Sequence, residues 1–246
     1  MKFSVLASGS KGNSTYIEAD GRKILIDVGI TFKDLSSRLE SVGINIDDID
    51  TLLITHSHSD HVKGLSTFYN KVKPTIYMAD KTYEELDLLD IDYVSLKEDF
   101  NIGNINIHVI TLSHDVACYG YIITYNGESI VYITDTGYIN ERYFGVLKNK
   151  NIYIFESNHD VEMNLKSKKP FRLRQRVVSD FGHLSNNQAA YYLSKIVGSD
   201  TKKIFLAHIS EDDNTEELAL ETTRKAIPKI DISCAKQREV LPMVEV

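Results

Sequence analysis

The chain has 246 residues, of which 42% are hydrophobic and 26% charged, and its formal net charge is −7. This length suits one large domain with a substantial core, and the composition is that of a globular protein, not a disordered or fibrous one. No stretch approaches the roughly 20 apolar residues of a membrane span, the N-terminus lacks the apolar run of a signal peptide, and the two cysteines show no CxxC spacing. We therefore expect a cytoplasmic protein with reduced thiols, and the acidic total excludes a surface coated in positive charge.

Short apolar segments in chain order predict two groups of strands, each followed by helices. The first group is KFSVLA (2–7), STYIEA (14–19), KILIDVG (23–29), TLLIT (51–55) and PTIYMA (74–79), with a helix over 31–43. The second is NINIHVITL (104–112), YGYIITYN (119–126), SIVYITDTG (129–137), NIYIFES (151–157), KKIFLAH (202–208) and DISCA (231–235), with helices over 186–198 and 215–227. A polar, basic loop is expected between 157 and 186. This order predicts two packed sheets with helices on their outer faces.

The segment THSHSDHVKG (55–64) leaves an apolar strand and concentrates metal-binding side chains. Its four candidates are His56, His58, Asp60 and His61. Four more candidates occupy polar loops at strand ends or helix entrances: His114, Asp135, His183 and His208. Imidazole and carboxylate donors suit Zn²⁺, and also Mn²⁺ or Fe²⁺. The sequence therefore predicts a metal site built where strands end.

Four of these segments together resemble the metallo-β-lactamase superfamily: HSHSDH (56–61), SHD (113–115), TDTG (134–137) and LAHIS (206–210). The resemblance implies an α+β fold, a four-layer αββα sandwich spanning residues 1–246 as one domain without a large insertion. It also implies two metal ions at one edge of the sandwich. The first ion would be held by His56, His58 and His114, the second by Asp60, His61 and His208, with Asp135 bridging them.

The resemblance further implies that Asp27 supports the ligand loop from behind, although a turn or capping role also explains it. The best-known β-lactamases of the superfamily carry a cysteine where this chain has Asp135. Oxygen-reducing di-iron members carry a glutamate at the position of His58, together with a flavin domain. The resemblance therefore disfavours both β-lactam cleavage and redox chemistry. It favours hydrolysis of another substrate by a hydroxide that the two ions generate.

Two further segments favour a phosphodiester substrate. His183 stands just before a helix expected to be capped near Ser185 or Asn186, and it is spare once seven ligands are assigned. It resembles the extra catalytic histidine of phosphodiesterase members and would protonate the leaving oxygen or bind a phosphoryl oxygen; a purely capping role is the alternative. KSKKPFRLRQR (166–176) has six basic residues and no acid.

If this basic segment is extended, Arg172, Arg174 and Arg176 lie on one side and contact phosphates together with Lys168 and Lys169. Phe171 would stack on a base or anchor the loop in the core. A solvated loop without function is the alternative for the whole segment.

LASGSKGNSTYIE (6–18), ESNHD (156–160), GHLSNNQAA (182–190) and LAHISEDDNTEELA (206–219) together resemble the YycJ/WalJ-type family. That resemblance implies a 5′-to-3′ DNA exonuclease. Ser8, Ser10 and Asn13 would bind a phosphate or form a plain turn. Glu156, Asn158 and His159 would orient His183, line the cleft, or simply support their loop.

The sequence thus predicts a metal-dependent phosphodiester hydrolase acting on nucleic acid, with Asp60 and His183 as catalytic groups. Two alternatives stay open: a phosphodiesterase for cyclic or modified nucleotides, and a non-catalytic, metal-dependent regulatory or nucleic-acid-binding protein.

Overall fold

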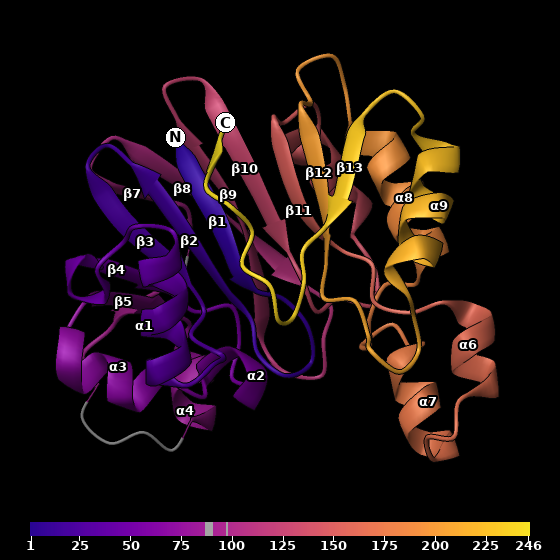
Figure 1. The fold of residues 1–246 in the computed structure, drawn as a ribbon, viewed down its shortest axis with the longest axis horizontal. Helices are drawn as coiled ribbons and strands as arrows, with labels where there is room; N and C mark the ends of the chain where they lie inside the picture. The colour runs from indigo at the N-terminus through magenta and orange to yellow at the C-terminus, as the bar shows by residue number, and fades with distance from the viewer. Residues whose placement is uncertain (87–90, 97) are drawn as a thin grey trace.

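Two mixed sheets face each other in the computed structural model, which describes residues 1–86, 91–96 and 98–246 (Figure 1). Within these residues the first sheet has the strand order β14 (Val244–Glu245), β1 (Lys2–Ala7), β2 (Ser14–Ala19), β3 (Arg22–Ile26), β4 (Thr51–Leu53), β5 (Thr75–Met78) and β6 (Val94–Ser95). The second has the order β13 (Asp231–Cys234), β12 (Lys203–Ala207), β11 (Ile152–Glu156), β10 (Glu128–Ile133), β9 (Cys118–Tyr125), β8 (Ile105–Leu112) and β7 (Phe100–Ile102).

Helices cover the outer face of each sheet. Those of the first half are α1 (Phe32–Ser41), α2 (Ser59–Val62), α3 (Leu65–Val72) and α4 (Asp80–Glu85). Those of the second half are α5 (Phe144–Leu147), α8 (Asn186–Ile196) and α9 (Glu216–Ala226), whereas α6 (Val161–Lys166) and α7 (Phe171–Val177) lie beyond the ends of α8 and α9 (Figure 1). The predicted αββα sandwich is confirmed. In the described part of the chain, no helix has the length and apolar character needed to cross a membrane.

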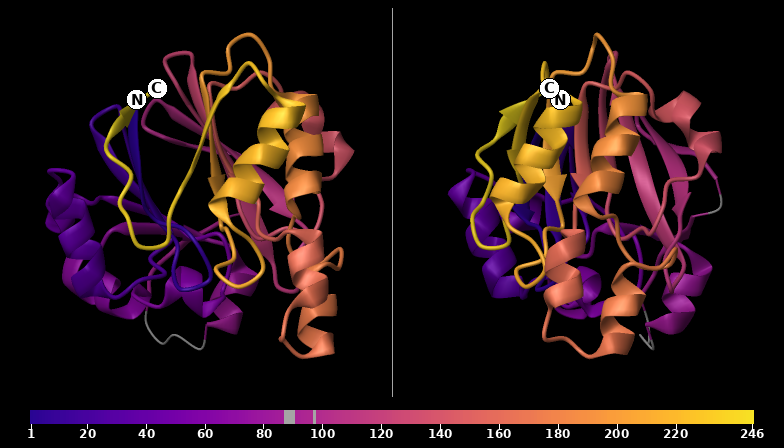
Figure 2. Two further views of the ribbon diagram at one scale, coloured as in Figure 1. Left: turned by 45° about the vertical axis from the view of Figure 1, so that its right-hand side comes forward. Right: turned by 90° about the vertical axis from the view of Figure 1, so that its right-hand side faces the viewer.

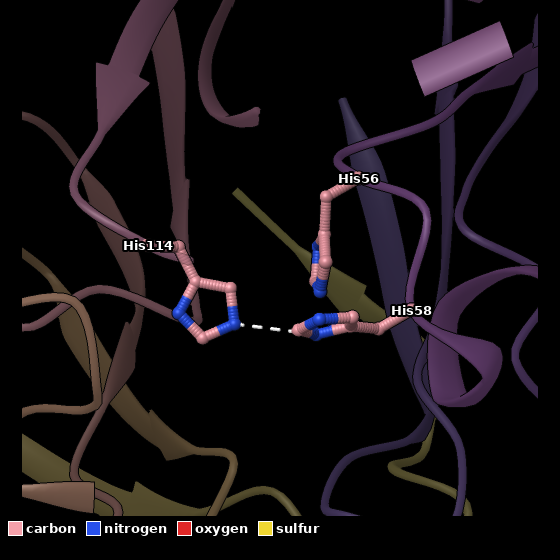
Figure 3. Close-up of side chains that lie close together, drawn as sticks. All are labelled: His56, His58 and His114. Carbon is pink, nitrogen blue, oxygen red and sulfur yellow. Dashed lines mark hydrogen bonds between the residues drawn. The ribbon is translucent and has the colours of Figure 1, made fainter. Parts of the chain in front are cut away.

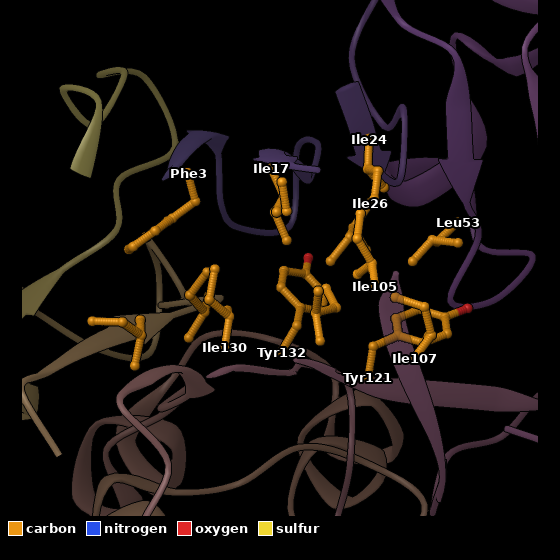
Figure 4. Packing of buried hydrophobic residues seen from close by; sticks show 14 of the residues in the cluster. Phe3, Ile17, Ile24, Ile26, Leu53, Ile105, Ile107, Tyr121, Ile130 and Tyr132 are labelled. Atoms are coloured by element: carbon orange, nitrogen blue, oxygen red, sulfur yellow. The ribbon is translucent and has the colours of Figure 1, made fainter. Parts of the chain in front are cut away.

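The apolar strands are buried on both faces because each sheet lies between the other sheet and a helical layer. In β11, Ile152 and Ile154 point into the core between the sheets, whereas Tyr153 and Phe155 pack toward the helices. Figure 4 shows the intersheet core, where isoleucines from both sheets meet the rings of Tyr121 and Tyr132. This double burial explains why the strands appear in the sequence as continuous apolar runs.

Parallel pairing of strands places the carboxyl ends of several strands at the same edge of the sandwich. β3 and β4 are parallel, as are β10, β11 and β12, so their carboxyl ends share an edge of the sandwich. Three residues just beyond these ends adopt left-handed backbone: Asp27 (φ 60°), Asp135 (φ 59°) and His208 (φ 55°). Non-glycine residues take this conformation at a cost in free energy and concentrate at functional sites. The edge that carries the predicted ligands therefore includes three residues in this conformation, two of them candidate ligands.

The segment between β11 and α8 differs from the predicted loop. Residues 161–177 form α6 and α7, joined across a short turn by a hydrogen bond from Arg174 Nη1 to the Leu165 carbonyl (2.6 Å). Asp160 caps α6 by accepting from Met163 N, and Pro170 precedes α7, where its fixed φ suits a helix start. Figures 1 and 2 show the two helices extending beyond the ends of α8 and α9. The prediction of a loop here is wrong.

Candidate metal centre and its pocket

Three histidines from two loops converge at the edge of the sandwich formed by the carboxyl ends of the parallel strands (Figure 3). His56 follows β4 and His114 follows β8, and a ring nitrogen of each lies within 4.8 Å of one from His58. His114 Nε2 and His58 Nδ1 are 3.3 Å apart. Burial, and then the neighbouring His61, lower the pKa of His56 well below its ordinary value. His56 is therefore neutral, the form in which imidazole binds a metal.

A second group lies beside the first. Ligand atoms of Asp60, His61 and His208 lie within 4.8 Å of one another, with Asp60 Oδ2 at 3.6 Å from Nε2 of each histidine. Asp135 Oδ2 lies 3.2 Å from His61 Nε2, and Asp135 also groups with His56. The structure thus brings the two predicted ligand trios together, with Asp135 between them.

Asp27 orients the second group from behind. Its buried carboxylate accepts hydrogen bonds from Thr55 N (2.8 Å), Thr55 Oγ1 (2.8 Å) and His61 Nδ1 (2.7 Å). A carboxylate on one imidazole nitrogen fixes the tautomer that leaves the other nitrogen free as a ligand. Of the two explanations for Asp27, support of the ligand loop is the one that these contacts favour.

Glu156 holds the opposite side of the site. Its Oε1 accepts from His183 Nδ1 (2.8 Å), His208 Nδ1 (3.0 Å) and Asp135 N (3.1 Å). Its Oε2 accepts from the backbone N–H groups of residues 136 and 184, both at 3.0 Å. Burial alone would raise the pKa of Glu156, but His183 and the other donors lower it to about 2. One ionised carboxylate therefore fixes three of the functional residues.

The carboxylates of Asp27, Asp60, Asp135 and Glu156 pair with histidines and, among the described residues, with no lysine or arginine. Burial would raise the pKa of Asp135, yet His208 and His61 hold it well below its usual range. Three buried atoms that face the groups have no hydrogen-bond partner in the described part of the chain: His56 Nε2, His208 Nε2 and Asp135 Oδ2. Unpartnered buried donors and acceptors are rare in proteins. Imidazole nitrogens, ionised carboxylates and buried ligand atoms without a hydrogen-bond partner together fit divalent cations.

A pocket of about 180 Å³ opens over these groups. Its lining includes His58, Asp60, His114, Asp135 and His208, with Ser10 on one side. On the other side are His183 and three residues of α7: Leu173, Arg176 and Val177. Because the last three are spaced i, i+3 and i+4, they form one face of the helix. The segment 166–176 therefore meets the site through one helical face, not through an extended row of arginines, and that part of the prediction is wrong.

The basic side chains of this segment have different partners. Lys169 Nζ pairs with the buried Asp213 (2.8 Å) and with Asp212 (3.3 Å), and Arg174 bonds to α6. These two hold the segment to the protein, and neither lines the pocket over the metal groups. Lys168 and Arg172 are exposed but do not line the pocket over the metal groups, and Phe171 is 66% exposed, so it is not a core anchor.

Arg176 is the one lysine or arginine among the described residues that line the pocket. Its guanidinium pairs with Asp115, a residue that our sequence reasoning did not single out. Asp115 Oδ1 lies 3.3 Å from His58 Nε2 and 3.4 Å from His114 Nε2. Its position directly after His114 was the only available signal, because a single aspartate carries no spacing pattern.

The predicted phosphate loop divides into two kinds of residue. Asn13 is fully buried and donates to Asp60 O (3.4 Å) and contacts His61 Nε2 (2.9 Å). Ser8 is also buried and accepts from His208 N (2.8 Å). Both buried residues support the ligand loops, so we do not assign them the predicted direct contact with a substrate phosphate. Ser10 is exposed and lines the pocket.

Asn158 and His159, both predicted to orient His183, line the cleft or support their loop, have different partners. Asn158 Nδ2 donates to the His208 carbonyl at 2.8 Å and so supports a candidate ligand. His159 is buried, and burial lowers its pKa to about 4. Its carbonyl accepts from Asn186 N (2.9 Å), which ties it to the start of α8 and not to the pocket. The helix itself begins at a Ser185 cap with a reciprocal bond from Gln188, as predicted.

Comparison with known proteins gives a consistent result. Residues 22–209 match the sequence model of a family described as the beta-lactamase superfamily domain. The chain is 38% identical over 227 residues to "Exodeoxyribonuclease YycJ" of Bacillus anthracis, covering 89% of this chain and 86% of that protein. It is 38% identical over 242 residues to "Exodeoxyribonuclease WalJ" of Streptococcus pneumoniae, covering 94% and 90%.

Among solved structures, the metallo-beta-lactamase fold protein YhfI from Bacillus subtilis superposes with a TM-score of 0.77. The match covers 97% of this chain and 98% of that one at 17% identity. At this identity the likeness shows a shared fold.

Proposed function

Because this chain belongs to the metallo-β-lactamase superfamily of hydrolases, and within it to the family of the exodeoxyribonucleases YycJ and WalJ, we propose that it is a metal-dependent nuclease. The proposed reaction is hydrolysis of phosphodiester bonds at the end of a DNA strand, in the 5′-to-3′ direction, by one catalytic domain acting in the cytoplasm. The observation that carries the proposal is the convergence of Asp60, His183 and Arg176 on one pocket above the two histidine groups.

We assign the metal ligands as the two trios with Asp135 between them. His56, His58 and His114 would hold one divalent cation, and Asp60, His61 and His208 a second. Zn²⁺ and Mn²⁺ suit this donor set, with Fe²⁺ as a third option. Such cations, when bound, supply Lewis acidity that polarises a phosphoryl oxygen and yields hydroxide from water at neutral pH.

The protein's own groups have distinct roles in this proposal. Asp60, on the pocket wall, orients the attacking water and takes its proton. His183 directs one ring nitrogen to Glu156, which leaves Nε2 to protonate the leaving oxygen. The buried carboxylate of Glu156 fixes the direction of the His183 ring through this hydrogen bond. Arg176 binds a phosphate oxygen, for which its planar set of donors is suited.

Positive charge outside the pocket supports a long anionic substrate. Residues 161–183 carry six basic and two acidic side chains, a net +4 within a chain of net −7, so the remainder carries −11. A nucleic acid is therefore attracted to this segment and repelled elsewhere. Lys168 and Arg172 are exposed there and strengthen the binding of nucleic acid through contacts with its phosphates. Such contacts weaken with added salt.

The test uses protein loaded with Mn²⁺ or Zn²⁺ and oligonucleotides labelled at either end, as DNA or RNA, with and without a 5′-phosphate. Release of labelled mononucleotide first from the 5′ end of DNA supports the proposal. Hydrolysis of bis(p-nitrophenyl) phosphate or cyclic nucleotides with intact oligonucleotides would favour the small-molecule phosphodiesterase. Binding of oligonucleotides without any hydrolysis, by protein with full metal content, would favour the non-catalytic alternative. Asp60→Asn is the inactive control.

A further inference from the structure

Asp115 joins the first histidine trio to helix α7. Its Oδ1 lies 3.3 Å from His58 Nε2 and 3.4 Å from His114 Nε2, and its Oδ2 receives the Arg176 Nη2 donor. One carboxylate thus contacts two candidate ligands with one oxygen and the pocket's arginine with the other. None of the roles assigned above uses this residue.

Arg176 needs such a partner in order to stay at the pocket. Its side chain is 51% exposed and stands in the last turn of α7, where a long flexible side chain adopts many rotamers in water. Its neighbours on the pocket face, Leu173 and Val177, are apolar and offer it no hydrogen bond. The pair with Asp115 is therefore what fixes the direction of the guanidinium.

The pair also leaves Arg176 able to bind a second anion. Only Nη2 has a partner within the described residues, whereas Nε and Nη1 keep their donors. Guanidinium has five N–H donors, so it can hold a carboxylate at one edge and a phosphate at another.

We propose that Asp115 is a positioning residue for substrate binding, which aims Arg176 at the phosphate held beside His58 and His114. This inference rests on the proposed nuclease function, because it presumes a phosphate substrate in the pocket. It assigns Asp115 an effect on KM through Arg176, not a part in the chemical step.

The test is a double-mutant cycle on the metal-loaded enzyme with Asp115→Asn, Arg176→Gln and both together. Arg176→Gln is expected to raise KM about tenfold or more, the effect of losing one charge-assisted hydrogen bond. Asp115→Asn is expected to raise KM several-fold and to leave kcat within about twofold. The double variant should match Arg176→Gln alone, because the effect of Asp115 passes through the arginine.

Two further variants separate positioning from general effects. Asp115→Glu keeps the charge and should restore most of the lost affinity. Asp180→Asn removes another exposed carboxylate from the loop after α7 and should leave KM within about twofold of wild type. Metal content is measured for every variant.

Additive effects in the cycle, an unchanged or lowered KM for Asp115→Asn, or loss of metal from that variant would overturn the inference. None of these outcomes touches the proposed function, which fails only if the wild-type protein does not cleave nucleic acid.

Discussion

The Nδ1 nitrogen of His183 donates to Oε1 of Glu156 at 2.8 Å, and the same oxygen receives Nδ1 of His208 at 3.0 Å. A single buried carboxylate therefore orients both the proposed general acid and a proposed metal ligand. This shared partner makes two separate predictions possible, one for chemistry and one for stability.

Replacing His183 by alanine should lower kcat by about 10² to 10⁴, the usual contribution of a positioned acid–base group. Metal content should stay at the wild-type level, because His183 lies outside both proposed trios. Single-turnover cleavage of an oligonucleotide, together with metal analysis, checks this. A loss of only about twofold would refute the catalytic role, and a loss of metal would make His183 a ligand.

Glu156→Gln should destabilise the protein as well as reduce its activity. The carboxylate accepts from the backbone N–H groups of residues 136 and 184, and an amide would turn its own N–H₂ toward some of these donors. Leaving buried donors unsatisfied costs about 1–3 kcal/mol each. Urea unfolding should show the drop, whereas Glu162→Gln, at an exposed position of α6, should leave the midpoint unchanged.

Asp27→Asn should weaken metal binding although it changes none of the proposed metal ligands. The amide cannot accept at once from Thr55 N, Thr55 Oγ1 and His61 Nδ1 as the carboxylate does. Loss of such a supporting contact typically lowers metal affinity by about 10- to 100-fold. Competition with a chromophoric chelator measures it. Equal affinity in the variant and wild type would show that Asp27 is only a turn residue.

Gly182→Ala should reduce activity through packing. A Cβ at this position would lie 2.2 Å from the carbonyl oxygens of both Arg176 and Val177, so the end of α7 must move. The Gly182 carbonyl also contacts His114 Nδ1 at 3.2 Å, and His183 is the next residue. Gly145→Ala is the matched control, since no described atom outside its own stretch of α5 lies within 4 Å of the added Cβ. Wild-type kinetics for both variants would show that the loop adapts.

Removal of the metals by a chelator should abolish activity and also lower the melting temperature. With the cations bound, the carboxylates of Asp60 and Asp135 are neutralised in the buried site, so ligand binding stabilises the folded state. Restoring Mn²⁺ or Zn²⁺ should recover both properties. A melting temperature that does not change with the chelator would argue against cations in the buried groups.

The sequence by itself determined the longer strands, though not the short edge strands β6, β7 and β14, together with the sandwich and the identity of most candidate ligands. Apolar runs buried on both faces have a strong pattern, and His56, His58, Asp60 and His61 lie so close in the chain that their local spacing indicates a metal site. The interpretation of the capped start of α8 at Ser185 also needed only a local signal.

Only the tertiary structure decided which side chains reach the pocket. Arg172, Arg174 and Arg176 look equivalent in sequence, but the helical backbone of α7 turns them in different directions, and Arg176 alone of the three faces the site. Two further residues show the same dependence on tertiary structure. Asn13, a predicted phosphate-binding residue, is buried behind His61. Asp115, to which the sequence analysis gave no role, contacts His58 and His114. The contacts Asn13–His61 and His58–Asp115 join distant parts of the chain through tertiary packing, and no local pattern in the chain encodes them.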